Sequence, residues 1–355
     1  MVTKKVKIGD RLVGEGEPCF IIAEAGVNHN GDVNLAKKLI DVAKEAQVDA
    51  VKFQTFKADE VMIVSAEKAE YQKETTGLDE LQHEMIRKLE LIEGHFKELS
   101  TYAKGKNILF LSSPFDKGSV DLLDELGVLA FKIGSGEITN FPLLKYIAQK
   151  GKPIILSTGM STLDEIEQAI EAIRKQGVED IILLHCVSCY PTEVKDMNLK
   201  AIETLRQAFK IPVGLSDHSL GITVLITAVA TGAHVIEKHF TLDKDLPGPD
   251  HRASLEPDEL EQMVTAIRDV EEAKGDGVKK LTKGEEENKK AARRSIVARV
   301  EIPVGMIITK EMLDIKRPGT GIEPKHLDKV IGRKVKIDIK RNALMSWNNL
   351  EEVSE

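Results

Sequence analysis

Short apolar runs, rich in β-branched residues, alternate with longer segments of helical periodicity between residues 19 and 274. Each run is bounded by Gly, Pro, Ser or Asp, which are typical of the turns that end a strand. The pattern predicts eight strands, over residues 20–26, 50–56, 108–114, 130–136, 153–158, 181–187, 212–218 and 235–241.

A helical pattern follows each predicted strand. Residues 34–47 place Leu35, Leu39 and Val42 on one face, and residues 257–272 begin with a proline, which suits the first turn of a helix. Eight strand–helix units predict a parallel sheet closed into a TIM barrel. An open doubly wound sheet is the alternative, and the number of units favours the barrel. The long helical insertion over residues 57–106 is expected to cover the barrel mouth.

The amino-acid composition changes after residue 274, where the alternation of strand and helix patterns ends. Residues 275–290 are charged and poor in large apolar side chains, which predicts a linker. Residues 291–355 combine short apolar runs with tight turns, which predicts a small β-rich domain. The predicted organisation is therefore a barrel over residues 1–274, a linker and a C-terminal domain.

The charge, the apolar content and the number of cysteines exclude several classes of protein. The chain has 355 residues and a net charge of −8, but residues 291–355 carry +4, so the barrel is strongly acidic. This charge argues against nucleic-acid binding. No apolar run is long enough to span a membrane, and the N-terminal segment lacks the apolar core of a secretion signal peptide. Three cysteines are too few to predict a disulfide framework in a chain of this length. We therefore expect a cytoplasmic protein.

Polar side chains occur at the carboxyl end of every predicted strand, where TIM barrels carry their active sites. Lys52, Gln54, Lys132 and Glu237 even lie inside apolar strands, where an ionised group is costly unless it is paired or bound to a ligand. Internal salt bridges would explain single positions. The whole set, together with the nearby serine hydroxyls, favours a site for a phosphate-bearing and carboxylate-bearing substrate.

His218 and His239 end neighbouring predicted strands, so their imidazoles can converge on a divalent metal such as Mn²⁺, Fe²⁺, Co²⁺ or Zn²⁺. A hydrogen-bonded core histidine is the alternative for either one alone. Cys186 and Cys189 have C-x-x-C spacing, but they follow a strand and precede Pro191 instead of opening a helix. We interpret them as two unpaired thiols.

Several long motifs follow one another along the barrel, and two more lie in the C-terminal domain. In the barrel they are IIAEAGVNHNGD, AVKFQTF, FLSSPFD, FKIGSGEITNFPLL, ILSTGMS, LLHCVSCYPT, GLSDHS, VIEKHFTLD and GPDHRASLEP, and in the C-terminal domain they are ARRSIVA and RPGTGI. By these motifs, in this order, the sequence resembles the sialic acid synthase (N-acetylneuraminate synthase) family over nearly its whole length. The two C-terminal motifs resemble the antifreeze-like domain of that family.

The resemblance implies a role for each matching residue. It implies a divalent metal, Mn²⁺ ahead of Mg²⁺, Co²⁺, Fe²⁺ or Zn²⁺, held by His218 and His239. It implies catalytic roles for Glu24, Lys52 and Glu137, with Glu137 as the candidate for proton transfer. The residues implied to bind phosphoenolpyruvate are Lys52, Lys132, Ser135, Ser157, Ser188 and Ser216, and those implied to contact the sugar are Glu24, Gln54, Ser113, Phe115, Glu137, Tyr190 and Asp250.

The implied reaction joins phosphoenolpyruvate to an open-chain N-acetylmannosamine-type sugar, with C–O cleavage and release of phosphate. The implied working unit is a homodimer in which the C-terminal domain is swapped and Arg317 enters the partner's barrel. Legionaminate, pseudaminate or 6-phosphate-sugar synthesis stay open as alternatives, with pseudaminate disfavoured by Asp250 and His251. Barrel enzymes that use arabinose or erythrose phosphates, and a non-catalytic sugar-phosphate sensor, are the more distant rivals.

Overall fold

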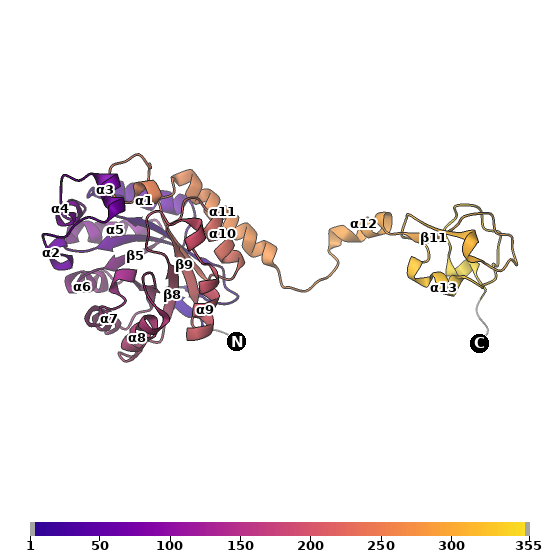
Figure 1. The fold of residues 1–355 in the computed structure, drawn as a ribbon, viewed down its shortest axis with the longest axis horizontal. Helices are drawn as coiled ribbons and strands as arrows, with labels where there is room; N and C mark the ends of the chain where they lie inside the picture. Colours follow the sequence, from indigo (N-terminus) through magenta and orange to yellow (C-terminus); the bar gives the residue numbers. More distant parts are fainter. Residues whose placement is uncertain (1–3, 352–355) are drawn as a thin grey trace. The chain divides into compact units, whose positions relative to one another are not determined.

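The computed structural model describes residues 4–351, which form two compact units that divide after Gly275 (Figure 1). None of the helices in this range is both long enough and apolar enough to cross a membrane.

Eight strands form the centre of the N-terminal unit. Their order is β5-β4-β3-β10-β9-β8-β7-β6, with parallel pairing, and β5 also lies against β6, so the sheet closes on itself. The predicted TIM barrel and all eight of its strands are confirmed. The strands are β3 (Phe20–Gly26), β4 (Ala50–Thr55), β5 (Leu109–Pro114), β6 (Phe131–Ile133), β7 (Ile154–Ser157), β8 (Ile181–Cys186), β9 (Val213–Asp217) and β10 (Val235–His239).

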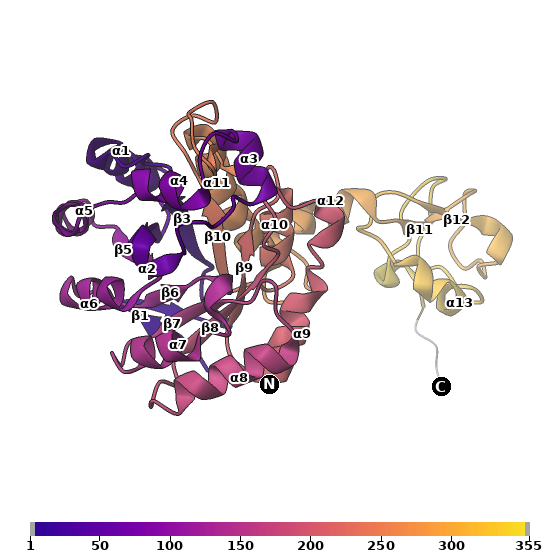
Figure 2. The same cartoon turned by 60° about the vertical axis from the view of Figure 1, so that its left-hand side comes forward.

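Helices surround this sheet (Figure 2). Their apolar side chains form one buried cluster with those of the strands. Asp32 caps the first helix by accepting a hydrogen bond from the Asn34 amide, and Thr162 and Glu165 form a capping box at the start of α8. These caps define the helix starts, because they satisfy amides that have no partner within the helix. The surrounding helices are α1 (Val33–Glu45), α5 (Glu93–Gly105), α6 (Lys117–Glu125), α7 (Phe141–Ala148), α8 (Leu163–Arg174), α9 (Lys200–Phe209), α10 (Thr223–Ala230) and α11 (Pro257–Lys274).

A short hairpin, β1 (Val6–Ile8) and β2 (Arg11–Val13), precedes the barrel and was not predicted from the sequence. Val6, Ile8 and Val13 form one apolar cluster with residues of the strands that include Phe20 and Leu111. The hairpin therefore closes the amino-terminal end of the barrel with apolar side chains. Polar side chains are left to gather at the opposite end.

The insertion after β4 contains α2 (Ala58–Val61), α3 (Glu70–Thr76) and α4 (Gln82–Lys88). Tyr71 of α3 stacks on Tyr190, which follows β8, with ring centroids 5.0 Å apart. The insertion thus reaches the carboxyl end of the barrel, as predicted.

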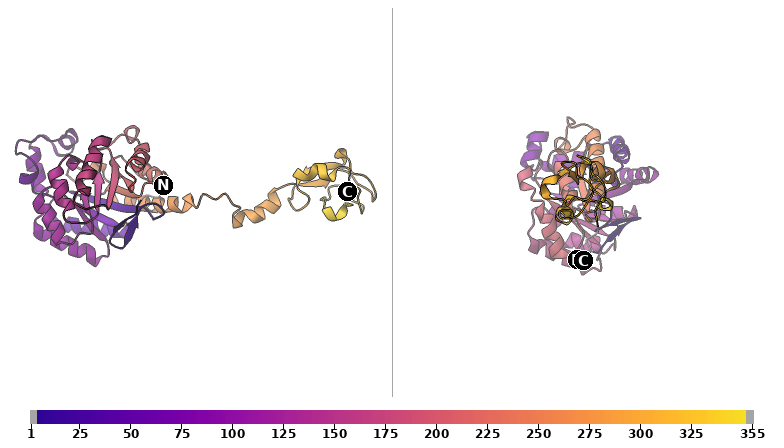
Figure 3. Two further views of the ribbon diagram at one scale, coloured as in Figure 1. Left: turned by 90° about the horizontal axis from the view of Figure 1, so that it is seen from below. Right: turned by 90° about the vertical axis from the view of Figure 1, so that its right-hand side faces the viewer.

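The C-terminal unit has its own apolar core, built around Ile296, Ile302, Leu313 and Val335. Its two named strands, β11 (Ser295–Ala298) and β12 (Leu313–Lys316), pair antiparallel, and single β-bridges join several of its loops. Loops and turns together make up about half of the unit, and after residue 292 its helical parts are short 3-10 turns and the helix α13 (Leu327–Val330) (Figure 3). Most of an exposed helix, α12 (Lys283–Ala292), falls within the range predicted as a linker.

Candidate active site

Four charged side chains meet inside the carboxyl end of the barrel. Glu24 on β3 and Lys52 on β4 are register partners, and the Lys52 ammonium lies 2.7 Å from a Glu24 carboxylate oxygen. Glu237 on β10 lies between the two lysines, 3.3 Å from Lys132 and 3.8 Å from Lys52. All four side chains are buried. The barrel therefore encloses a network of two ammonium groups and two carboxylates.

Hydroxyl and amide groups from neighbouring strands complete this network. Lys52 donates to the Ser113 hydroxyl at 3.2 Å and Lys132 to that of Ser157 at 2.8 Å. The Ser216 hydroxyl donates to Glu237 at 3.0 Å, and the Gln54 amide donates to Glu24 at 3.2 Å. The structure thus brings together seven residues that the sequence assigned to one site, and their roles stay predictions. They are Glu24, Lys52, Gln54, Ser113, Lys132, Ser157 and Ser216.

Burial changes the protonation of these groups. It raises the pKa of Glu24 to about 7, although Lys52 opposes the shift. Burial also lowers the pKa of Lys132, against the attraction of Glu237. Burial alone would raise the pKa of Glu237, but Lys132 and Lys52 outweigh it and hold that pKa below its usual value. Glu24 is therefore the carboxyl group that can gain or lose a proton near neutral pH.

His218 and His239 lie together beside this network, with ring centroids 5.5 Å apart. Tyr190 covers them, with its ring centroid 4.1 Å from that of His218 and 6.0 Å from that of His239. Burial and the neighbouring His218 hold the pKa of His239 well below its usual value, so this imidazole is neutral. The structure confirms the prediction that the side chains of His218 and His239 converge.

The two imidazoles fit a metal with open coordination positions. His218 Nδ1 lies 2.9 Å from the Val187 carbonyl oxygen, which leaves its Nε2 for another partner. His239 Nδ1 is buried and forms no hydrogen bond with any residue that the structure describes. Within residues 4–351, no three His, Cys, Asp or Glu side chains are grouped as a ready metal site. A metal here would take its remaining ligands from substrate oxygens or water.

Ser135 and Ser188 define a third group of polar atoms, around Gly159 after β7. The Ser135 hydroxyl accepts a hydrogen bond of 2.9 Å from the Gly159 amide. A Cβ added at Gly159 would lie 2.8 Å from the Ser135 hydroxyl and would overlap that of Ser188. Only glycine leaves room here for both hydroxyls. Cys186 adjoins this group, with its sulfur 3.8 Å from the Ser188 hydroxyl.

The remaining predicted residues lie outside the charged network. Asp250 is buried, and burial raises its pKa to about 6, with an opposing effect from His218. Glu137 accepts a hydrogen bond of 2.7 Å from the Asn140 amide. Phe115 packs on Phe56 with their ring centroids 6.3 Å apart. Arg317 belongs to the C-terminal unit, where its side chain is exposed.

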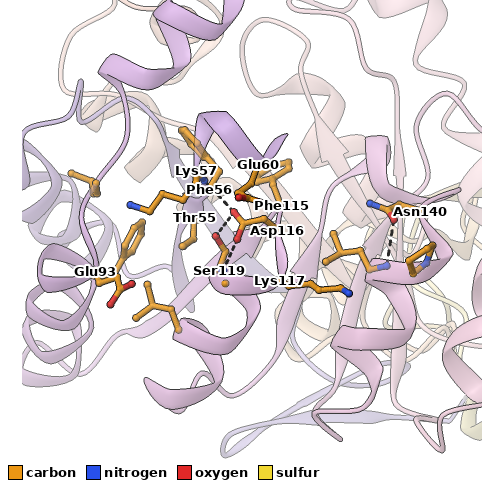
Figure 4. Close-up of a pocket in the computed structure, with 16 residues that line it drawn as sticks. Thr55, Phe56, Lys57, Glu60, Glu93, Phe115, Asp116, Lys117, Ser119 and Asn140 are labelled. Carbon is orange, nitrogen blue, oxygen red and sulfur yellow. Dashed lines mark hydrogen bonds between the residues drawn. The ribbon is translucent and has the colours of Figure 1, made fainter. Parts of the chain in front are cut away.

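A cavity of about 570 Å³ lies among the segments that follow β4 and β5 and the starts of α5, α6 and α7 (Figure 4), and none of its lining residues belongs to the charged network. It is lined by Thr55, which ends β4, by Phe115, which follows β5, and by Asn140, which donates a hydrogen bond to Glu137. Asp116 in its wall accepts hydrogen bonds from the amide and the hydroxyl of Ser119. The cavity is therefore bounded by α5, α6 and α7 and contains none of the buried lysines, glutamates or histidines described above.

Sequence reasoning missed the central position of Glu237, which contacts both lysines. The sequence did show that Glu237 is a carboxylate within an apolar strand. It could not show whether Glu237 pairs with one neighbouring lysine or contacts both Lys52 and Lys132 across the barrel interior. Tyr71 was also missed, because no local pattern brings an insertion residue to Tyr190. Cys186 and Cys189 are both free thiols, as predicted, and Cys186 is the buried one.

The fold and site define a (β/α)₈ barrel whose mouth holds buried lysines and glutamates, serine hydroxyls and two converging histidines. The NeuB family model matches residues 39–279, and the SAF domain model matches residues 293–351. The chain therefore belongs to the NeuB family, and its C-terminal unit is the antifreeze-like domain expected from the resemblance.

Individual relatives agree with this assignment. An N,N'-diacetyllegionaminic acid synthase from Campylobacter jejuni is 53% identical over 88% of this chain and 95% of its own. A synthase of the same name from Legionella pneumophila is 47% identical over 95% of this chain and 96% of its own. The crystal structure of the N-acetylneuraminic acid synthetase from Leptospira borgpetersenii is 38% identical, with a TM-score of 0.71 over 81% of this chain and 95% of that one.

Proposed function

We propose that this protein is a nonulosonate synthase that condenses phosphoenolpyruvate with an open-chain N-acetylated aldehyde sugar and releases phosphate. The observation that carries the proposal is the buried pair Lys52 and Lys132, each hydrogen-bonded to a serine hydroxyl, beside two converging histidines. Membership of the NeuB family supports the same reaction class.

The charge balance of the site suits an anionic substrate. With its pKa near 7, Glu24 is partly protonated at neutral pH, so the two lysines are not fully neutralised by the two glutamates. A phosphate or carboxylate would supply the missing negative charge where solvent is largely excluded. The hydroxyls of Ser135 and Ser188 at Gly159 add neutral donors for phosphate oxygens.

The proposed reaction forms one carbon–carbon bond and exchanges the C2–O bond to phosphate for a C2–O bond to an oxygen atom from water. C3 of phosphoenolpyruvate attacks the aldehyde carbon, whose oxygen takes a proton, and water adds to C2 and loses a proton. The resulting tetrahedral centre expels phosphate and leaves a keto group. Glu24 is the better placed of the two candidate glutamates for proton transfer, because it lies inside the network. A divalent metal held by His218 and His239 would polarise the aldehyde oxygen.

For the sugar we propose a mannose-type aldehyde with two acetamido groups, ahead of N-acetylmannosamine. Two relatives, 53% and 47% identical, are synthases of N,N'-diacetyllegionaminic acid, whereas the solved N-acetylneuraminic acid synthetase is 38% identical. This reverses the order in which the sequence resemblance placed these sugars. Pseudaminate-type and 6-phosphorylated sugars rank below both.

The test is a steady-state assay of phosphate release from phosphoenolpyruvate, with each candidate sugar in turn and with Mn²⁺ supplied. We expect the diacetamido sugar to give the highest kcat/KM and mass spectrometry to detect the nonulosonate. Phosphoenolpyruvate labelled with ¹⁸O in its bridging C–O–P oxygen should deliver the label to inorganic phosphate. Binding of both substrates without turnover would support the sensor alternative instead, and a preference for arabinose 5-phosphate or erythrose 4-phosphate would contradict the proposed sugar class.

A further inference from the structure

A wholly buried ion pair on the outer side of the barrel strands takes no part in the chemistry proposed above. The Lys238 ammonium lies 2.9 Å from an Asp217 carboxylate oxygen, and neither side chain is exposed to solvent. The two residues are direct register partners on β10 and β9. Because side chains alternate along a strand, this pair points away from the barrel interior, which Ser216, Glu237 and His239 face.

The pair holds the backbone on both sides of a site histidine. Lys238 also donates a hydrogen bond to the Ser219 carbonyl oxygen, and Asp217 accepts one of 2.9 Å from the Ser219 amide. His218 lies between Asp217 and Ser219, and His239 directly follows Lys238 in the sequence. A single ammonium group therefore fixes the ends of the two strands that carry the two imidazoles.

Stability alone is a weak reason for such a pair. Desolvation of two charges offsets much of their attraction, so apolar residues of similar size often stabilise a protein equally well. An ion pair with defined hydrogen bonds does what an apolar contact cannot, because it fixes direction and register between two strands. Groups that orient metal-binding histidines commonly change metal affinity when they are altered.

We propose that Lys238 and Asp217 are positioning residues, which keep His218 and His239 at the separation and orientation needed to share one divalent metal. The inference rests on the proposed function, which assigns the metal to these histidines. It adds that metal affinity depends on a pair that touches neither metal nor substrate.

The experiment measures Mn²⁺ binding to the purified full-length protein by electron paramagnetic resonance, without substrate. Three variants are compared with the wild type: Lys238→Met, Asp217→Asn and the double variant. The single variants leave one charge buried without its partner and are expected to be less stable. The double variant has neither charge, so its melting temperature should be higher than those of the single variants. It still lacks the hydrogen bond from the Lys238 ammonium to the Ser219 carbonyl oxygen. We expect its Kd for Mn²⁺ to rise by about 10-fold to 100-fold.

Asp49→Asn is the matched control. Asp49 pairs with Arg11 and Arg268 at the opposite end of the strands and accepts a hydrogen bond from the Ile21 amide. This variant should lower the melting temperature and leave Mn²⁺ affinity unchanged.

The outcomes separate this inference from the function on which it rests. If the double variant binds Mn²⁺ as tightly as the wild type, and His218→Ala does not, the positioning role is wrong and the proposed metal site stands. If the wild type and His218→Ala bind Mn²⁺ equally weakly, the metal site itself is wrong, and the inference falls with it. Loss of Mn²⁺ affinity in the double variant, together with unchanged Mn²⁺ affinity in Asp49→Asn, confirms the positioning role.

Discussion

Burial and charge act on Glu24 in opposite directions, and burial is the stronger effect. Its carboxylate faces one lysine at 2.7 Å, which favours ionisation, but the loss of solvent raises its pKa to about 7. Glu237 lies equally deep but close to both lysines, and its pKa is held below the usual value. Two carboxylates in one network therefore take different protonation states, as acid–base catalysis at neutral pH requires.

Glu24→Gln should reduce kcat by on the order of 100-fold to 10,000-fold, because the amide cannot exchange the proton. The KM for phosphoenolpyruvate should change little, and the dependence of kcat on a group that titrates near pH 7 should disappear. Glu137→Gln is the comparison, since Glu137 is the other candidate for proton transfer. A larger kcat loss in Glu137→Gln than in Glu24→Gln would transfer the role to Glu137.

Gly159→Ala should raise the KM for phosphoenolpyruvate at least tenfold, because the added methyl group would take the space of the Ser135 and Ser188 hydroxyls. Gly136→Ala is the control, since a Cβ at Gly136 would meet no atom within 4 Å. Steady-state kinetics and melting temperatures of both variants test this. Similar KM values for Gly159→Ala and the wild type would show that the two hydroxyls do not bind substrate.

The barrel strands were predictable because each is an apolar run of the length a buried parallel strand needs. The β1–β2 hairpin was missed because its strands have three residues each, too few to show a period. Most of the side chains that meet in the candidate site could be chosen from the sequence, since polar residues at strand ends converge in a barrel, but their roles stay predictions. The bridging role of Glu237 was not, because it depends on which side chains meet across the interior.

Ile8→Ala in the hairpin should lower the free energy of unfolding by about 2–5 kcal/mol, the usual cost of truncating a large buried side chain. Ile8 is fully buried in the cluster that closes the barrel. Leu12→Ala in the same hairpin is the control, because Leu12 is 44% exposed and its truncation should cost no more than about 0.5 kcal/mol. Urea unfolding measures both, and equal costs would show that the hairpin is not part of the core.

At the scale of the whole molecule, the barrel's stability should depend on pH through buried histidines. Burial lowers the pKa of His234 to about 4, and its Nδ1 accepts a hydrogen bond from the Val213 amide, which requires the neutral ring. The unfolded chain, with an ordinary histidine pKa near 6.5, binds the proton more readily. The stabilisation is therefore present above about pH 6.5 and is lost as the pH falls towards 4.

When the pH falls from 7 to 5, the free energy of unfolding of the wild type should decrease by about 2 kcal/mol more than that of His234→Gln, because only the wild type has this histidine to protonate. Paired urea titrations at the two pH values measure the difference and cancel the contributions of other groups. Identical losses in the two proteins would show that His234 is not held neutral in the folded state.

We further propose the homodimer in which Arg317 acts in the barrel of the partner copy. Arg317→Ala should then keep both units folded and strongly reduce sugar use. A mixed dimer of Arg317→Ala with Lys132→Met, isolated through two different tags, should recover about half of the wild-type activity, because one of its two sites is intact. No recovery in a verified mixed dimer, or full activity in a monomer, would contradict this arrangement.

The run of exposed residues from 275 to 292 bears on how this chain can change over evolutionary time. Residues 275–282 form no regular helix or strand, and no side chain from 275 to 292 is buried in either core. Substitutions there cost little packing energy, and added or deleted residues would disturb neither unit directly. Within the NeuB family, we therefore expect length differences between homologues to accumulate in this segment, while the barrel and the antifreeze-like domain keep their lengths.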